Sequence, residues 1–251
     1  MSRPVAIVGA LHAELAEILA AMPDEQQVRL GGRTFWRGHW QAHEVVVAVS
    51  GMGKAAAATT TALLLDHFDA SHVLMSGVAG GLAPVARVGD VIVAQALVQH
   101  DVDARPLLPR WQLPGQTSPR IATDGVLTQV LQAAAQDAVT WLPKLLDAQT
   151  LAQLGLHSPA VHSGLMLSGD QFVGTQAASD ALRTDWPDAW CVDMETAAVA
   201  QVCQDFGVPF GAVRTISDRA DDTAHVDFEH FLTQVARFYS TRILRKALNL
   251  L

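Results

Sequence analysis

Cysteine, tyrosine and charged residues are scarce in this chain. Its 251 residues include 2 cysteines and 1 tyrosine, and only 17% are charged. Cys191 and Cys203 have no metal-ligand spacing and suggest no disulfide framework, so the sequence indicates a reducing, cytoplasmic location. With 50% hydrophobic residues, the chain has the opposite balance to that of a disordered protein.

A basic surface and a long apolar run are also missing. The net charge is −8, from 25 acidic and 17 basic residues, which argues against nucleic acid or an anionic membrane as a partner. No stretch approaches the ~18 consecutive apolar residues of a membrane-spanning helix. The apolar run at residues 5–8 is too short for the core of a signal peptide, so we expect none.

What the chain does have is an alternation of apolar, β-branched runs with segments of helical spacing. Strands are expected at 5–8, 35–39, 45–49, 73–75, from 89, at 160–167, 190–192 and 208–216, and helices at 11–22, 55–68, 123–137, 175–183, 196–206 and 228–250. The glycines at 77–81 are expected to end the 73–75 strand, and the proline-rich stretch 104–120 to form a long loop. Residues 138–158 are ambiguous and could hold an inserted helix. The alternation favours an α/β fold in one domain, 1–251, with a mixed central sheet flanked by helices.

Two glycine-rich segments invite a ligand-binding interpretation. Residues 51–54, Gly-Met-Gly-Lys, lack the spacing of a phosphate-binding loop and favour a tight strand-to-helix turn. Residues 76–81 follow a buried strand and could wrap a ligand or form an ordinary turn. They do not match the dinucleotide-binding pattern, so hydride transfer is a weak alternative.

Acidic and histidine side chains provide the other candidates. On a strand, Asp101 and Asp103 of the His-Asp-Val-Asp segment 100–103 would face one side and could hold a metal. No second cluster has ligand spacing, so we predict no metal, and a polar strand end or subunit contact is favoured. Glu14 could be solvated or catalytic, and Asp218 could be a desolvated carboxylate or a helix N-cap. Glu195 suits a helix N-terminus, but a carboxylate there could equally bind a ribose diol.

Taken together, these segments resemble the nucleoside phosphorylase/nucleosidase superfamily, and within it most closely the 5′-methylthioadenosine/S-adenosylhomocysteine nucleosidases. The matching segments are 7–10 with Glu14, 50–54, 77–81, 89–93, 100–103, 112–115, 168–172, 192–198 and 213–218. The Met-Glu pair at 194–195 and the Ser-Asp pair at 217–218 are the specific ones. The resemblance covers nearly the whole chain except roughly 138–158.

The resemblance implies a nucleoside phosphorylase-like fold, usually as a homodimer, that hydrolyses the N-glycosidic bond of adenine 5′-thionucleosides without a cofactor. It implies that Glu14 activates water and Asp218 protonates the purine, while Arg214 orders the water and the carboxylates. The substrate contacts it implies are Met194 and Glu195 on the ribose, Phe172 and the Val173 backbone on the base, Gly80 against the nucleoside, and Phe228 in the 5′ pocket.

The residue types suit this chemistry. Adenine leaves poorly as an anion, so it must gain a proton as the bond breaks, and Asp218 must then have a raised pKa. The ribose becomes oxocarbenium-like, and one carboxylate acts as acid while the other acts as base. The family precedent is direct attack by water with inversion.

The sequence departs from the family pattern in two places, which leaves rival functions open. Val78 stands where many relatives carry Ser, and the loop segment 104–108, Ala-Arg-Pro-Leu-Leu, lacks the expected aromatic-rich stretch. Futalosine or aminodeoxyfutalosine hydrolysis is one rival. A purine nucleoside phosphorylase is another, although the turn before Glu14 has no arginine for phosphate. A non-catalytic nucleoside sensor is the third, and it would need no water-activating base.

Overall fold

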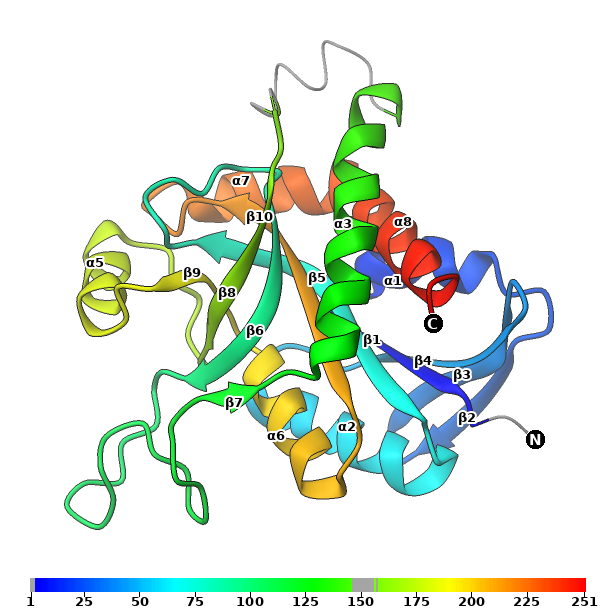
Figure 1. The fold of residues 1–251 in the computed structure, drawn as a ribbon, viewed down its shortest axis with the longest axis horizontal. Helices are drawn as coiled ribbons and strands as arrows, with labels where there is room; N and C mark the ends of the chain where they lie inside the picture. Colours follow the sequence, from blue (N-terminus) through cyan, green and yellow to red (C-terminus); the bar gives the residue numbers. More distant parts are fainter. Residues whose placement is uncertain (1–2, 146–155, 157) are drawn as a thin grey trace.

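The computed structural model describes residues 3–145, 156 and 158–251. Its centre is a twisted mixed sheet with helices on both faces (Figure 1). The strands are β1 (Val5–Gly9), β2 (Gln26–Leu30), β3 (Arg33–Trp40), β4 (His43–Val49), β5 (His72–Gly81), β6 (Val91–Gln99), β7 (Ile121–Ala122), β8 (Val161–Ser168), β9 (Ala189–Asp193) and β10 (Phe210–Asp218). This is the α/β class with a mixed central sheet that the sequence predicts.

Helices connect most of these strands. They are α1 (His12–Ala20), α2 (Lys54–Phe68), α3 (Gly125–Leu145), α5 (Gln176–Asp185), α6 (Thr196–Phe206), α7 (Ala224–Phe231) and α8 (Arg237–Leu248). A π-helical turn at Leu232–Ala236 joins α7 to α8, so the single long final helix predicted from residue 228 is interrupted. Helix α3 continues past residue 137 into the ambiguous segment, and most of the remainder of that segment lies outside the described residues. Within the described residues, no helix is both long and apolar enough to cross a membrane.

Successive residues of β1 point to opposite faces of the sheet. Ile7 joins the core formed with α1, α3 and α8, while Ala6 and Val8 join the core formed with α2 and α6 (Figure 1). Both faces are therefore covered, and every residue of β1 is buried. This explains why the strand is apolar throughout instead of alternating.

Strand β5 is the centre of the pairing pattern. It pairs in parallel with β1 and β10, and antiparallel with β9. Strand β10 continues to β6, β6 to β8, and β8 to β9, so the pairings of these five strands close on themselves. The carboxyl-terminal half of β5 is thus enclosed by β9 and β10.

The glycine run does not end its strand as expected. Strand β5 continues through Gly81, with Gly77 opposite Arg214 and Gly80 opposite both Asp218 and Val192. The glycines are needed for close approach: a Cβ atom on Gly77 would lie 1.9 Å from Arg214 Nη1. The sequence-based interpretation of this run as a strand end is therefore wrong.

Two further segments bear on the sequence-based expectations. Strand β2 was not predicted. Its residues are mostly exposed, and within the described part of the chain it pairs only with β3, at the edge of the sheet. The stretch 104–120 has turns but no helix or strand, as predicted.

Candidate active site

A cavity that opens to solvent lies where β1, β5, β9 and β10 end, and it measures about 660 Å³ with the solvent space at its mouth included. It is lined by Ala10, Leu11, Glu14, Met52, Val78, Ala79, Gly80, Gln171, Phe172, Val173, Val192, Asp193, Met194, Glu195, Arg214, Ser217, Asp218 and Phe228. All nine site residues named from the sequence are among them. Their individual roles stay predictions, but the fold gathers them around one cavity.

Glu14 lies in the first turn of α1, directly after the end of β1. Its Oε2 accepts hydrogen bonds from the backbone N–H groups of Ala10 (2.8 Å) and Leu11 (2.9 Å), and its Oε1 accepts one from Val78 (3.0 Å). The bond to Leu11 caps the helix, as a glutamate at this position commonly does. Only 1% of Glu14 is exposed. Burial raises the pKa of its carboxyl group, against the opposing effects of Arg214 and the three N–H groups.

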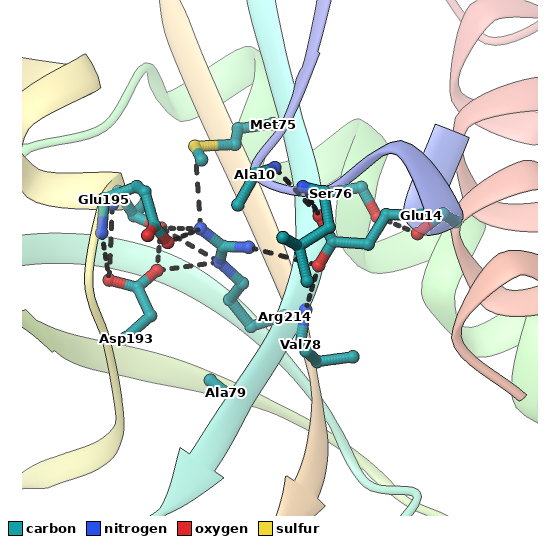
Figure 2. A network of polar contacts seen from close by, with 12 residues as sticks. Ala10, Glu14, Met75, Ser76, Val78, Ala79, Asp193, Glu195 and Arg214 are labelled. Atoms are coloured by element: carbon teal, nitrogen blue, oxygen red, sulfur yellow. Dashed lines mark hydrogen bonds and ion pairs between the residues drawn. The ribbon is translucent and has the colours of Figure 1, made fainter. Parts of the chain in front are cut away.

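Arg214 is enclosed by carboxylates on two sides (Figure 2). Its Nε lies 2.7 Å from Asp193 Oδ2, its Nη2 lies 3.5 Å from Glu195 Oε2, and its Nη1 lies 4.0 Å from Glu14 Oε1. The side chain is 1% exposed and points across Gly77 from the middle of β10. A buried guanidinium must be paired to be tolerated, and here one cation is shared by three acids.

Glu195 is the N-cap residue of α6 and follows the end of β9. Its Oε1 accepts a hydrogen bond from the Gly53 backbone N–H at 2.9 Å. Burial and the neighbouring Asp193 carboxylate raise the pKa of Glu195 to about 7. A carboxylate held between a helix N-terminus and Arg214, with one face on a cavity, can accept hydrogen bonds from hydroxyl groups.

Asp193 lines the cavity and pairs with Arg214, and the sequence interpretation did not name it as a site residue. Ser168 Oγ and Thr196 Oγ1 donate hydrogen bonds to its two oxygens, and Arg214 pairs with it. The signal was present, because Asp193 directly precedes the Met-Glu pair at a strand end. Its partner on β10, however, can be identified only from the fold.

Asp218 is the last residue of β10 and is 2% exposed. Its Oδ2 accepts a hydrogen bond from Ser217 Oγ (2.7 Å), and its Oδ1 accepts one from the Ala220 N–H (2.8 Å). Along β5, Glu14 contacts Val78 while Asp218 pairs with Gly80. The two carboxylates therefore approach β5 two residues apart, about 7 Å along the strand. The expected rise in the pKa of Asp218 stays a prediction.

Aromatic and aliphatic side chains form the rest of the wall. Phe172 and Phe228 meet edge to face, with ring centroids 5.9 Å apart. Phe172 is 50% exposed and Met52 is 65% exposed, whereas Val173 is buried. The cavity thus combines a buried cluster of carboxylates with an apolar, partly open rim, which suits a ligand with one polar and one apolar end.

Two further motifs, the Gly-Met-Gly-Lys segment at 51–54 and the His-Asp-Val-Asp segment at 100–103, contact each other. Lys54 Nζ contacts Asp101 Oδ1 at 2.5 Å and Gln99 Oε1 at 3.2 Å, and Lys54 does not line the cavity. Strand β6 ends at Gln99, so the argument that Asp101 and Asp103 share one face of a strand is wrong. Among the described residues, no group of three His, Cys, Asp or Glu residues could hold a metal ion.

A family model described as the phosphorylase superfamily matches residues 4–249. The chain belongs to the phosphorylase superfamily. The resemblance to this superfamily drawn from the motifs is therefore confirmed.

Three proteins illustrate where the chain falls within this superfamily. The 5′-methylthioadenosine/S-adenosylhomocysteine nucleosidase of Anoxybacillus flavithermus is 34% identical over 246 residues, which are 98% of this chain and 97% of that protein. The nucleosidase of the same name from Neisseria meningitidis, solved with methylthio-immucillin-A, has a TM-score of 0.87 and 30% identity over 100% of both chains. A futalosine hydrolase of Helicobacter pylori has a TM-score of 0.84 and 32% identity, covering 99% of this chain and 98% of that one.

Proposed function

We propose that this protein is an N-glycosyl hydrolase that acts on 5′-methylthioadenosine, S-adenosylhomocysteine and 5′-deoxyadenosine. It releases adenine and the 5-substituted ribose and needs no cofactor. Superfamily membership and the likeness to nucleosidases support the reaction class. The observation that carries the proposal for this chain is the position of Glu14 beside the cavity.

Glu14 favours water over phosphate as the nucleophile. Its carboxylate already occupies the backbone N–H groups of Ala10, Leu11 and Val78, which could otherwise bind an anion. The arginine that lines the cavity, Arg214, is already paired with three acids. A phosphate ion here would meet negative charge without a free guanidinium partner, so phosphorolysis is disfavoured.

The reaction then proceeds by inversion at C1′. Water attacks C1′ while the bond from C1′ to N9 breaks, and the bonding electron pair moves into the purine. Asp218 gives its proton to the purine ring, and Glu14 takes a proton from the attacking water. Arg214 stabilises Glu14 in its ionised form, which is the form a base requires.

The other cavity residues hold the substrate in this proposal. Glu195 accepts hydrogen bonds from the ribose hydroxyls, and Met194 packs on the sugar. Phe172 stacks on the adenine, the Val173 backbone binds its edge, and Gly80 lies against the nucleoside. Phe228, in contact with Phe172, lines the pocket for the 5′ substituent.

Futalosine or aminodeoxyfutalosine hydrolysis is the second candidate. It is favoured by the likeness to a futalosine hydrolase and by Val78, which lines the cavity where the family resemblance implies a serine hydroxyl in many relatives. A nucleoside sensor is disfavoured, because binding alone requires no buried base beside the cavity.

We also propose a homodimer in a reducing cytoplasm. Leu107, in the loop after β6, is 88% exposed, and a partner subunit in contact with this loop would cover it. Cys191 and Cys203 are both buried and unpaired, as a reducing compartment permits. Light scattering at micromolar concentration tests the dimer, which a fully active monomer would contradict.

A substrate panel tests the proposed activity. The protein is incubated with 5′-methylthioadenosine, S-adenosylhomocysteine, 5′-deoxyadenosine, inosine and futalosine, and the released bases are separated by chromatography. We expect adenine from the first three substrates, with little hypoxanthine from inosine. Release of hypoxanthine from futalosine, with no release of adenine, would favour the second candidate.

A further inference from the structure

Asp101 connects two segments that are far apart in the sequence. Its Oδ1 lies 2.5 Å from Lys54 Nζ, and its Oδ2 accepts a hydrogen bond from the Asp170 backbone N–H at 2.9 Å. The ion pair is mostly shielded, since the side chains of Lys54 and Asp101 are 15% and 26% exposed. Both carboxylate oxygens of Asp101 are therefore used, one by each segment.

A third contact joins the same two segments directly. The Lys54 backbone N–H donates a hydrogen bond to Asp170 Oδ1 at 2.7 Å, at the N-terminus of α2. The buried Gln99 accepts a bond from the Lys54 ammonium at 3.2 Å, which fixes the end of that side chain. Lys54, Asp101 and Asp170 thus form a closed triangle of contacts.

Each of the two joined segments carries part of the cavity wall. Met52 belongs to the turn before α2, while Gln171, Phe172 and Val173 follow Asp170 directly. In the same turn, the Gly53 N–H binds the Glu195 carboxylate. A shift of this turn would therefore move Met52 and remove a hydrogen bond from Glu195 together.

Packing buries Val173 but leaves the side chains of Met52 and Phe172 at the rim largely uncovered. Met52 is 65% exposed and Phe172 is 50% exposed, so neither side chain is fixed by burial. The backbone of the turn is constrained, since Gly53 has a φ of +90° and a Cβ atom there would lie 3.1 Å from Asp170 Oδ1. The polar contacts of Lys54, Asp101 and Asp170 therefore add positional order at this part of the rim.

We propose that Asp101 is a positioning residue for the nucleoside site. Through Lys54 and the Asp170 backbone it holds the Met52 turn and the Gln171–Val173 segment at the spacing that lets both contact one nucleoside. This role rests on the proposed function, because it concerns the binding of that substrate. This role also explains the His-Asp-Val-Asp segment at residues 100–103 without a metal site.

Steady-state kinetics on 5′-methylthioadenosine test the proposal. Asp101→Asn can still accept a bond from Lys54, but its amide group then faces the Asp170 N–H, donor against donor. We expect KM to rise about tenfold with kcat changed less than about threefold, since bonds to charged groups are among the stronger ones. Lys54→Met should raise KM to a similar extent. Because both substitutions break the same contact, the double variant should raise KM no more than either single variant does. Lys54→Arg keeps the positive charge, so its KM should lie within about threefold of the wild-type value.

Asp188→Asn is the matched control. Asp188 forms an exposed ion pair with Arg120, at 2.8 Å, and neither residue lines the cavity. This variant should leave KM and kcat unchanged.

A purely structural role for Asp101 would lower the melting temperature of Asp101→Asn without changing KM, and that result would overturn the proposal. If Asp101→Asn does not fold, an unchanged KM in Lys54→Met would overturn it equally. A wild-type protein that cleaves no nucleoside would instead contradict the proposed function, and this inference with it.

Discussion

Arg214 Nη1 and Glu14 Oε1 lie 4.0 Å apart, with both side chains 1% exposed, and Gly77 is the residue between them. A Cβ atom on Gly77 would lie 1.9 Å from Arg214 Nη1 and 2.6 Å from Glu14 Oε1. The glycine of a central strand thus leaves the space in which the proposed base meets its cation. The site therefore depends on the absence of a Cβ atom at Gly77 as well as on the charged groups around it.

Gly77→Ala should disable the enzyme. Arg214 cannot move aside easily, because Asp193 and Glu195 hold it from the other side. We expect a loss of at least about a hundredfold in kcat, the scale of a lost acid–base group, and a destabilisation of about 1–3 kcal/mol from overpacking.

Gly125→Ala is the control for this substitution. A Cβ atom on Gly125 would meet nothing within 4 Å. Its effect on the free energy of unfolding should stay within about 0.5 kcal/mol. Kinetics and thermal unfolding of the two variants make the comparison, and normal turnover by Gly77→Ala would contradict the account of this contact.

The two proposed catalytic carboxylates should respond differently to the leaving group. Glu14→Gln and Asp218→Asn keep the size of their side chains, and each should lose about 10²–10⁴-fold in turnover of 5′-methylthioadenosine while remaining folded. A nitrophenyl riboside needs no protonation of its leaving group. It should therefore rescue Asp218→Asn but not Glu14→Gln, and equal rescue of both variants would show that the roles are assigned wrongly.

The raised pKa of Glu195 should lower the free energy of unfolding as the pH rises. Its pKa is about 7 in the folded protein, above the ordinary value of 4.5, so the folded state binds more protons than the unfolded state between these values. The free energy of unfolding must then fall as the pH rises through that window. Burial raises the pKa of Glu14 as well, which acts in the same direction.

Thermal unfolding of the wild type and Glu195→Gln between pH 5 and 8 measures this contribution. We expect the melting temperature of the wild type to fall more steeply with pH than that of the variant. The lowered pKa values of His72 and His100, caused by burial, act in the opposite direction but are common to both proteins. Equal slopes would contradict the assignment of a raised pKa to Glu195.

Much of the fold follows from local patterns in the sequence. Strand β1 and helix α6 were predictable because an apolar β-branched run and an alanine-rich segment each have one favourable structure. The edge strand β2 was not, because its sequence, Gln-Gln-Val-Arg-Leu, has little apolar content and its pairing with β3 decides its structure. The glycines of β5 locally signal a break, and only their neighbours in space explain why the strand continues.

The site was predictable as a set of residues but not as a network. The family resemblance singled out Glu14, Glu195 and Asp218, which the residue patterns alone had left open, and all three lie at or just after strand ends, where ligands gather. That Arg214 holds both Glu14 and Asp193 depends on contacts between segments as much as 200 positions apart in the chain. Such contacts have no local signature, so the role of Asp193 and the connection made by Asp101 required the structure.

The most direct test of the central claim is the dependence of the reaction on phosphate. The protein is incubated with 5′-methylthioadenosine in phosphate-free buffer and in buffer with excess phosphate, and the sugar product is identified by mass spectrometry. Because the Glu14 carboxylate already uses the backbone N–H groups of Ala10, Leu11 and Val78, which could otherwise bind an anion, we predict equal rates of adenine release and free 5-methylthioribose in both buffers. Adenine release that requires phosphate, with a sugar 1-phosphate as the product, would contradict the account.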